Sequence, residues 1–180
     1  IYEQSDEAIN KLYESGRQAS LDYFETIYRR LGTRFDFYFF ESESGPIGQA
    51  LVQDNLGPIF ESSQGAVVFR GEKYGLHTRV FINSEGLPTY EAKELGLAKL
   101  KFERYHYDRS IVITGNEIDS YFTVIKKALE LIFPDLAEKT KHLPHGLLRL
   151  PTGKMSSRTG TVITAESLLS EVKSAIKQKI

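Results

Sequence analysis

Helical and extended patterns alternate from residue 89 to residue 150, and this alternation limits the folds open to the chain. Thr89 is a suitable N-cap for a helix through Tyr105, and the apolar segment 110–114 predicts a strand. A helix over 118–133 and a strand over 146–150 are predicted next. Because helices that alternate with short apolar strands form parallel sheets, this part predicts an α/β fold.

The first 85 residues show a different pattern. Three- and four-residue spacing of apolar residues predicts an amphipathic helix over 5–31, with Gly32 as its stop. The aromatic segment 34–40 predicts a buried strand, residues 45–56 predict a short helix, and the segments 66–70 and 78–82 predict an antiparallel hairpin. The turn at 84–88 marks the expected boundary, and Thr164 caps a predicted final helix.

A loop rich in cations and hydroxyl groups follows the last predicted strand. It runs Gly153-Lys154-Met155-Ser156-Ser157-Arg158-Thr159-Gly160. Glycine at both ends allows close approach to a ligand, and preplaced cations stabilise the charge that grows on a departing polyphosphate. At the carboxyl edge of a parallel sheet, where α/β folds bind nucleotides, such a loop predicts phosphate handling. A solvent-exposed connector is the alternative.

A second candidate site lies at the start of the helix that Thr89 caps. Tyr90 and Glu94 are four residues apart and therefore share a helix face. A carboxylate beside an aromatic ring can hold a guanidinium by paired hydrogen bonds and stacking, which suits Arg better than Lys. Taken alone, the pair fits equally a solvated carboxylate beside a core tyrosine.

These motifs together resemble one family. Lys154-Met155-Ser156-Ser157-Arg158 resembles the second signature of class I aminoacyl-tRNA synthetases, usually Lys-Met-Ser-Lys-Ser, and the Arg-x-Gly continuation resembles arginyl-tRNA synthetases. The segment from Thr89 to Glu94 is similar to their arginine-binding Thr-Tyr-x-x-x-Asp helix. The resemblance extends from about residue 35 to 164, with further matches at 65–70, 113–117, 121–122 and 146–147.

The resemblance implies a role for each matching residue. Substrate arginine would contact Tyr90, Glu94 and Ile118, and the nucleotide would lie against His145, Gly146, Leu147, Lys154 and Met155. Lys154, Ser156, Ser157 and Arg158 would act catalytically on the triphosphate. Three positions depart from the family pattern: Glu94 stands for the usual Asp, Ile118 for a frequent Gln, and Ser157 for the second Lys of the signature.

The resemblance also implies a domain organisation. Residues 1–85 would be a connective α+β insertion, residues 86–164 the second half of a Rossmann-like nucleotide-binding domain, and residues 165–180 a helix leading to a further domain. The first class I signature, a His-x-Gly-His-type turn, does not occur in the sequence. We therefore expect an excerpt of a longer enzyme, one that is inactive by itself.

The implied function is arginine–tRNA ligase activity in protein biosynthesis. The expected substrates and partners are ATP with Mg²⁺, L-arginine and tRNA(Arg), without DNA or a membrane. The alternatives are a non-catalytic synthetase-like module that binds RNA or a protein partner, and a related class I nucleotidyltransferase. The upstream coding sequence would separate the first alternative from the enzyme, and selectivity among arginine analogues would separate the second.

Composition narrows the classes further. The chain has 180 residues, 41% hydrophobic content, no Cys and a net charge of -1, which favour a folded cytoplasmic protein without disulfides or a general nucleic-acid footprint. His142 and His145 have metal-compatible spacing but lack a third ligand, so no metal site is predicted.

Overall fold

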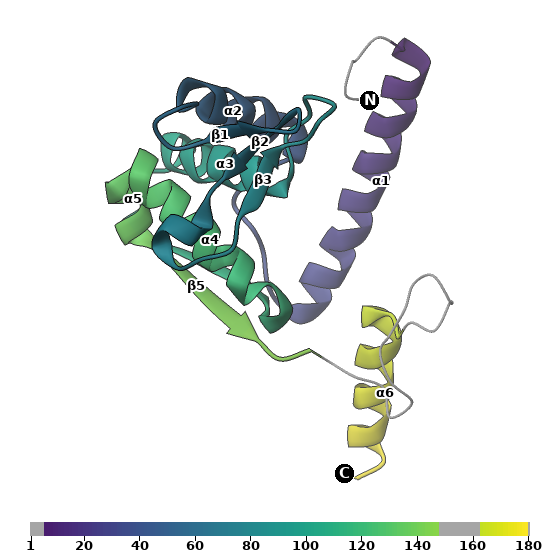
Figure 1. Ribbon diagram of the computed structural model, residues 1–180. Coiled ribbons are helices and arrows are strands. Elements are labelled where there is room, and N and C mark those ends of the chain that lie inside the picture. The colour runs from purple at the N-terminus through teal and green to yellow at the C-terminus, as the bar shows by residue number, and fades with distance from the viewer. Residues whose placement is uncertain (1–5, 148–162, 180) are drawn as a thin grey trace. The chain divides into compact units, whose positions relative to one another are not determined.

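The computed structural model describes residues 6–147 and 163–179, which separate into two units. One unit contains the helices α1 (Glu7–Leu31) and α6 (Ala165–Lys177), and the other runs from Phe39 to Leu147 (Figure 1). The Asp6 carboxylate accepts from two backbone N–H groups at the start of α1, and Gly32 ends it in the left-handed conformation. Thr164 caps α6 through the N–H of Ser167. Both predicted helices are therefore confirmed, and α1 begins two residues later than predicted.

The segment after α1 is not the buried strand that the sequence predicts. Residues 33–40 form no strand, and Phe35 and Phe37 are 54% and 44% exposed. The Phe35 ring instead packs edge-on against Tyr28 of α1, with 4.7 Å between ring centroids. An aromatic ring of this segment thus packs on a neighbouring helix. A short apolar run in a sequence does not reveal whether its side chains pack in a sheet or against a helix, so the strand prediction was wrong.

An antiparallel sheet forms the first half of the larger unit. Its strands are β1 (Glu61–Ser63), β2 (Ala66–Phe69) and β3 (Arg79–Ile82), in the order β1-β2-β3. The 3-10 helix η1 (Gly71–Tyr74) lies in the connection between β2 and β3, so the predicted hairpin with a long loop is confirmed. Its aromatic core consists of the fully buried residues Phe60, Phe69 and Phe81.

Two helices pack closely over this core. They are α2 (Glu41–Asp54) and α3 (Tyr90–Arg104), which cross where Gly48 meets the backbone of Ala92 (Figure 1). The sequence predicts α2 four residues too late, because Gly45-Pro46 resembles a helix break. The helix begins earlier instead, where the Phe40 N–H donates to the Glu43 carboxylate at 3.0 Å.

A two-stranded parallel sheet forms the second half. Strand β4 (Ser110–Gly115) is followed by the 3-10 helix η2 (Asn116–Ile118), α4 (Asp119–Ile132), α5 (Pro134–Lys139) and β5 (Thr140–His145). Strands β4 and β5 pair in parallel, from Ser110 with Thr140 to Gly115 with His145. The α/β arrangement with a parallel sheet is therefore confirmed.

The last strand lies earlier than the sequence predicts. Residues 140–145 pair with β4, whereas Gly146 and Leu147 follow the strand and residues 148–150 lie outside the described part. Pro144 is the reason that the sequence does not predict this strand. Proline has no backbone N–H to donate to a neighbouring strand, and its presence usually argues against a central strand. Among the described residues β5 has a single partner strand, and such an edge position tolerates proline.

Within residues 6–147 and 163–179, no helix is long and apolar enough to cross a membrane.

Candidate functional site

The carboxyl ends of β4 and β5 bring two predicted site segments together. Gly115 pairs with His145, so η2 and the residues after β5 leave the same edge of the sheet. A Cβ atom added to Gly115 would lie 2.9 Å from Cδ2 of Leu147. Ile118 of the predicted arginine site and Leu147 of the predicted adenine site therefore belong to segments that touch through Gly115.

The predicted site residues at this edge are accessible. Ile118 ends η2 and is 37% exposed, and Leu147 is 42% exposed. The His145 ring is exposed, and its Nδ1 lies 2.7 Å from the Gly146 carbonyl oxygen, so Nδ1 donates there. Among the described residues the other ring nitrogen, Nε2, has no hydrogen-bond partner, and in the neutral ring it is an acceptor.

Tyr90 and Glu94 have contrasting surroundings although they are one turn apart on α3. Tyr90 is 68% exposed, and the Lys93 ammonium lies 5.1 Å from the centroid of its ring. Glu94 is partly buried and lines a cavity of about 20 Å³, which Tyr90 does not line. A volume of that size corresponds to roughly one water molecule, so it does not hold a guanidinium without widening.

Burial dominates the electrostatics of the Glu94 cavity. It raises the pKa of the Glu94 carboxyl above its ordinary value, and the positive charge of Lys101 partly offsets that effect. Burial likewise lowers the pKa of Lys101, whose Nζ donates to Ser110 Oγ at 3.1 Å. The pKa of the Tyr121 phenol is raised by burial and by the charge of Glu94.

Glu94 is unusual among the carboxylates of the unit. Within the residues that the structure describes, its carboxylate has no hydrogen bond and no ion pair within 4 Å. A partly buried carboxylate whose pKa is raised by burial and that lacks a close partner is a candidate ligand-binding group. Sequence spacing alone does not show these surroundings of Glu94.

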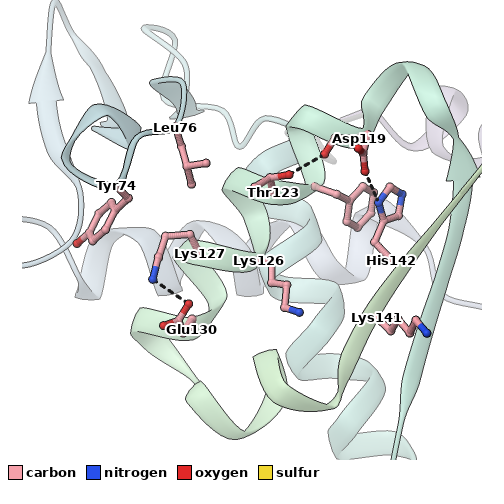
Figure 2. Close-up of a pocket in the computed structure, with 10 residues that line it drawn as sticks. Tyr74, Leu76, Asp119, Thr123, Lys126, Lys127, Glu130, Lys141 and His142 are labelled. Carbon is pink, nitrogen blue, oxygen red and sulfur yellow. Dashed lines mark hydrogen bonds and ion pairs between the residues drawn. The ribbon is translucent and has the colours of Figure 1, made fainter.

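A separate cleft of about 450 Å³ runs along α4, between η1 and β5 (Figure 2). Its charged and titratable lining residues are Asp119, Lys126, Lys127, Glu130, Lys141 and His142. Lys127 is paired with Glu130 at 2.9 Å, and Asp119 lies 3.2 Å from His142. None of the residues with a predicted site role lines this cleft. From the sequence, His142 is considered only as a possible metal ligand.

The remaining predictions concern the cation-rich loop and a metal site. Lys154, Met155, Ser156, Ser157 and Arg158 lie outside the described residues. Among residues 6–147 and 163–179, no three His, Cys, Asp or Glu side chains gather in a way that could hold a metal ion. His142 and His145 have different partners, Thr114 with Asp119 and Gly146 respectively.

Comparison with protein families gives a match over almost the whole chain. The family described as tRNA synthetases class I (R), catalytic domain, matches residues 2–180. An arginine–tRNA ligase of Porphyromonas gingivalis is 32% identical over 174 residues, which cover 96% of this chain and 29% of that protein. A second one, from Flavobacterium psychrophilum, is 32% identical over 180 residues and 30% of its length is covered. The chain thus spans less than a third of the curated relatives it matches.

Solved structures show the same fold. The arginyl-tRNA synthetase of Plasmodium falciparum superposes with a TM-score of 0.70 at 16% identity, over 98% of this chain and 31% of that chain. The arginyl-tRNA synthetase of Thermus thermophilus gives a TM-score of 0.58 at 20% identity, over 94% of this chain and 37% of that chain. At these identities the likeness concerns the fold.

Proposed function

Because the chain belongs to the catalytic-domain family of class I arginyl-tRNA synthetases, we propose that it forms part of an arginine–tRNA ligase. In the first step an arginine carboxylate oxygen attacks the α-phosphorus of ATP, an O–P bond forms, and pyrophosphate leaves. In the second step the arginyl group passes to a tRNA hydroxyl and AMP is released. Neither step requires a covalent intermediate with the protein.

Glu94 is the structural observation that carries the arginine assignment. Its partly buried carboxylate has no close partner among the described residues, and burial raises its pKa. A guanidinium provides two parallel N–H donors and a permanent positive charge, so it would hold this carboxylate in the ionised form. Widening of the small cavity beside Tyr90 would accompany binding, and the exposed Tyr90 ring would lie against the ligand.

ATP would bind at the carboxyl edge of β4 and β5. His145, Gly146 and Leu147 would border the adenine, as parallel sheets bind nucleotides at this edge. Lys154, Ser156, Ser157 and Arg158 would neutralise the charge that grows on the leaving pyrophosphate, with Met155 beside the nucleotide. Mg²⁺ would arrive with ATP and share this neutralisation. The division into residues 1–85, 86–164 and 165–180 remains part of this proposal.

The first test is ligand-induced thermal stabilisation. The chain and the complete gene product are titrated with a non-hydrolysable arginyl-adenylate analogue beside the lysyl and glutamyl analogues, because a ligand that binds the folded state raises the melting temperature. Selective stabilisation of either protein by the arginyl analogue supports the proposal. Equal response to all three, or none in the complete gene product, contradicts it and favours a non-catalytic module or another substrate.

Kinetic variants of the complete gene product assign the residues. Glu94→Gln keeps the side-chain size and removes the charge, so we expect mainly a higher KM for arginine in ATP–pyrophosphate exchange. Lys154→Ala should mainly lower kcat, because its charge acts on the leaving group. Glu91→Gln is the matched control for Glu94→Gln, since Glu91 is on the same helix and is already paired with Arg79 at 3.6 Å. An unchanged arginine KM in Glu94→Gln would remove Glu94 from the site.

A further inference from the structure

His142 lies between two polar side chains in an arrangement that no predicted role explains. Its Nδ1 is 3.2 Å from Asp119 Oδ1, and its Nε2 is 2.7 Å from Thr114 Oγ1. The ring stacks on Phe122 with 4.2 Å between centroids and an interplanar angle of 10°. The side chain is only 11% exposed. Figure 2 shows the contact between His142 and Asp119 at the end of the cleft.

Both ring nitrogens of His142 face polar groups. The Asp119 carboxylate lies beside Nδ1, a contact that is an ion pair when the ring is protonated. The Thr114 hydroxyl is hydrogen-bonded to Nε2 and also donates to the Gly115 carbonyl oxygen at 3.2 Å. Each of the two ring nitrogens thus has its own partner, and the flat stack on Phe122 fixes the plane of the ring. Three elements, β4, α4 and β5, are tied by one side chain.

The two partners of His142 flank the segment Gly115–Ile118. Thr114 directly precedes this segment, and Asp119 directly follows it. Within the segment, Gly115 meets Leu147 so closely that a Cβ would lie 2.9 Å from the Leu147 side chain. His142 therefore contacts both ends of the turn that carries Ile118, and its own contacts are with Thr114, Asp119 and Phe122.

We propose that His142 is a positioning residue that fixes the Gly115–Ile118 turn against Leu147 by holding Thr114 and Asp119 at its two ends. This inference rests on the proposed function, in which the turn borders arginine and Leu147 borders the adenine. Misplacement of a binding turn by a fraction of an ångström weakens substrate positioning, whereas the fold around it is kept by packing. His142 acts through its neighbours and touches no reacting atom.

His142→Phe separates hydrogen bonding from packing. A phenyl ring preserves the aromatic stack on Phe122 and removes both the hydrogen bond to Thr114 and the contact with Asp119. His142→Gln is the conservative variant, because its amide retains one donor and one acceptor. His106→Phe is the matched control, since His106 also contacts an aromatic ring, Phe102 at 5.0 Å between centroids, but is exposed and has neither Thr114 nor Asp119 as a partner.

The experiment measures ATP–pyrophosphate exchange by the complete gene product at varied arginine and ATP. We expect His142→Phe to raise the KM for both substrates about tenfold. His142→Gln should recover most of that loss, and His106→Phe should leave both KM values unchanged. A merely structural role of His142 would reduce the amount of active enzyme and therefore kcat, but not the KM of the molecules that remain folded.

Coupling between His142 and Thr114 provides the second readout. Thr114→Val keeps the β-branched shape and removes the hydroxyl, so it should raise the KM values in the wild type but add little in the His142→Phe background. Unchanged KM values in His142→Phe, or full additivity with Thr114→Val, would overturn the inference. Wild-type protein without arginine-dependent exchange would instead overturn the proposed function, so the two failures are distinguishable.

Discussion

The larger unit contains two small sheets that differ in how far their apolar side chains are buried. In the antiparallel sheet β1-β2-β3, the rings of Phe60, Phe69 and Phe81 are at most 1% exposed and pack against one another. In the parallel sheet β4-β5, Ile111 and Ile113 are 53% and 66% exposed. Parallel sheets are normally covered on both faces. The first sheet therefore has a complete core among the described residues, and the second has a covered face and an exposed one.

The difference separates stability from function. The antiparallel sheet holds the fold through close apolar contacts, and no residue with a predicted site role belongs to β1, β2 or β3. The covered face of the parallel sheet contains polar side chains instead, among them Ser110 and Thr114, which bond to Lys101 and His142. Substitutions in the first region should thus change the free energy of unfolding, and substitutions around the second should change ligand binding.

Phe81→Ala should have the largest effect on stability. Phe81 is 0% exposed and lies 4.8 Å from Phe60 between ring centroids. Truncation of such a ring leaves a cavity that costs about 3–5 kcal/mol of the free energy of unfolding. Urea unfolding of the chain measures it, with the exposed Phe35→Ala as control, for which we expect below about 1 kcal/mol. A small loss in Phe81→Ala would mean that the aromatic core is not what holds this sheet.

Gly48→Ala tests the helix pair that covers the same core. A Cβ at Gly48 would lie 1.8 Å from the Ala92 carbonyl oxygen, which forces α2 and α3 apart. We expect a loss of about 3 kcal/mol, at the upper end of overpacking costs. Gly45→Ala in the same helix is the matched control, because its Cβ would be 3.7 Å from the nearest atom and should be neutral or slightly stabilising. Equal behaviour of the two variants in urea unfolding would contradict the close crossing.

The sequence anticipated those parts of the fold whose signals are local. Gly32 and Thr164 mark the ends of α1 and α6, and the break between segments 66–70 and 78–82 marks the hairpin. The predictions were wrong where contacts between segments distant in sequence determine the secondary structure. Residues 34–40 form no strand, and Phe35 packs on Tyr28 of α1 instead. Pro144 is tolerated in β5 because this strand is at an edge among the described residues. Thr89 caps α3 by position only, because its hydroxyl donates to Val80 and Phe81 carbonyls.

For the candidate site, the sequence predicted which residue types take part but not how they are arranged in space. The motif at Tyr90 and Glu94 indicated a guanidinium site, but only the structure shows that Glu94 lines a small cavity while Tyr90 is exposed. The sequence indicated no contact of His142 with Thr114 or Asp119, because these partners are 28 and 23 residues away. The roles of Ile118, His145, Gly146 and Leu147 stay predictions, and the loop at Lys154 lies outside the described residues.

Glu94→Gln sharpens the comparison through the pH dependence of stability. Burial raises the pKa of the folded-state carboxyl above its unfolded value, so the stability that protonated Glu94 contributes is present at low pH and is lost as pH rises through the folded pKa. Glutamine does not ionise and avoids this loss. The variant should therefore melt above the wild type at pH 7 and equal it near pH 4, while binding arginine less well. A lower melting temperature at pH 7 would mean that ionised Glu94 stabilises the fold.

Ile113→Ala should have the smallest effect and tests the comparison most directly, with Ile82→Ala as its counterpart in the other sheet. Ile82 is 4% exposed and Ile113 is 66% exposed, so the same truncation should cost about 2–5 kcal/mol at Ile82 but below about 1 kcal/mol at Ile113 in the 180-residue chain. The free energy of unfolding of both variants is measured in urea.

Hydrogen exchange of the β4 amides in the complete gene product then shows whether the exposed face is covered there. If Ile113→Ala speeds exchange in β4 in that protein but leaves the chain unchanged, the parallel sheet completes its packing with residues outside this chain. If the variant changes hydrogen exchange in neither protein, Ile111 and Ile113 are exposed to solvent in both. The parallel sheet then has one solvent-exposed face, and no residues outside this chain cover it.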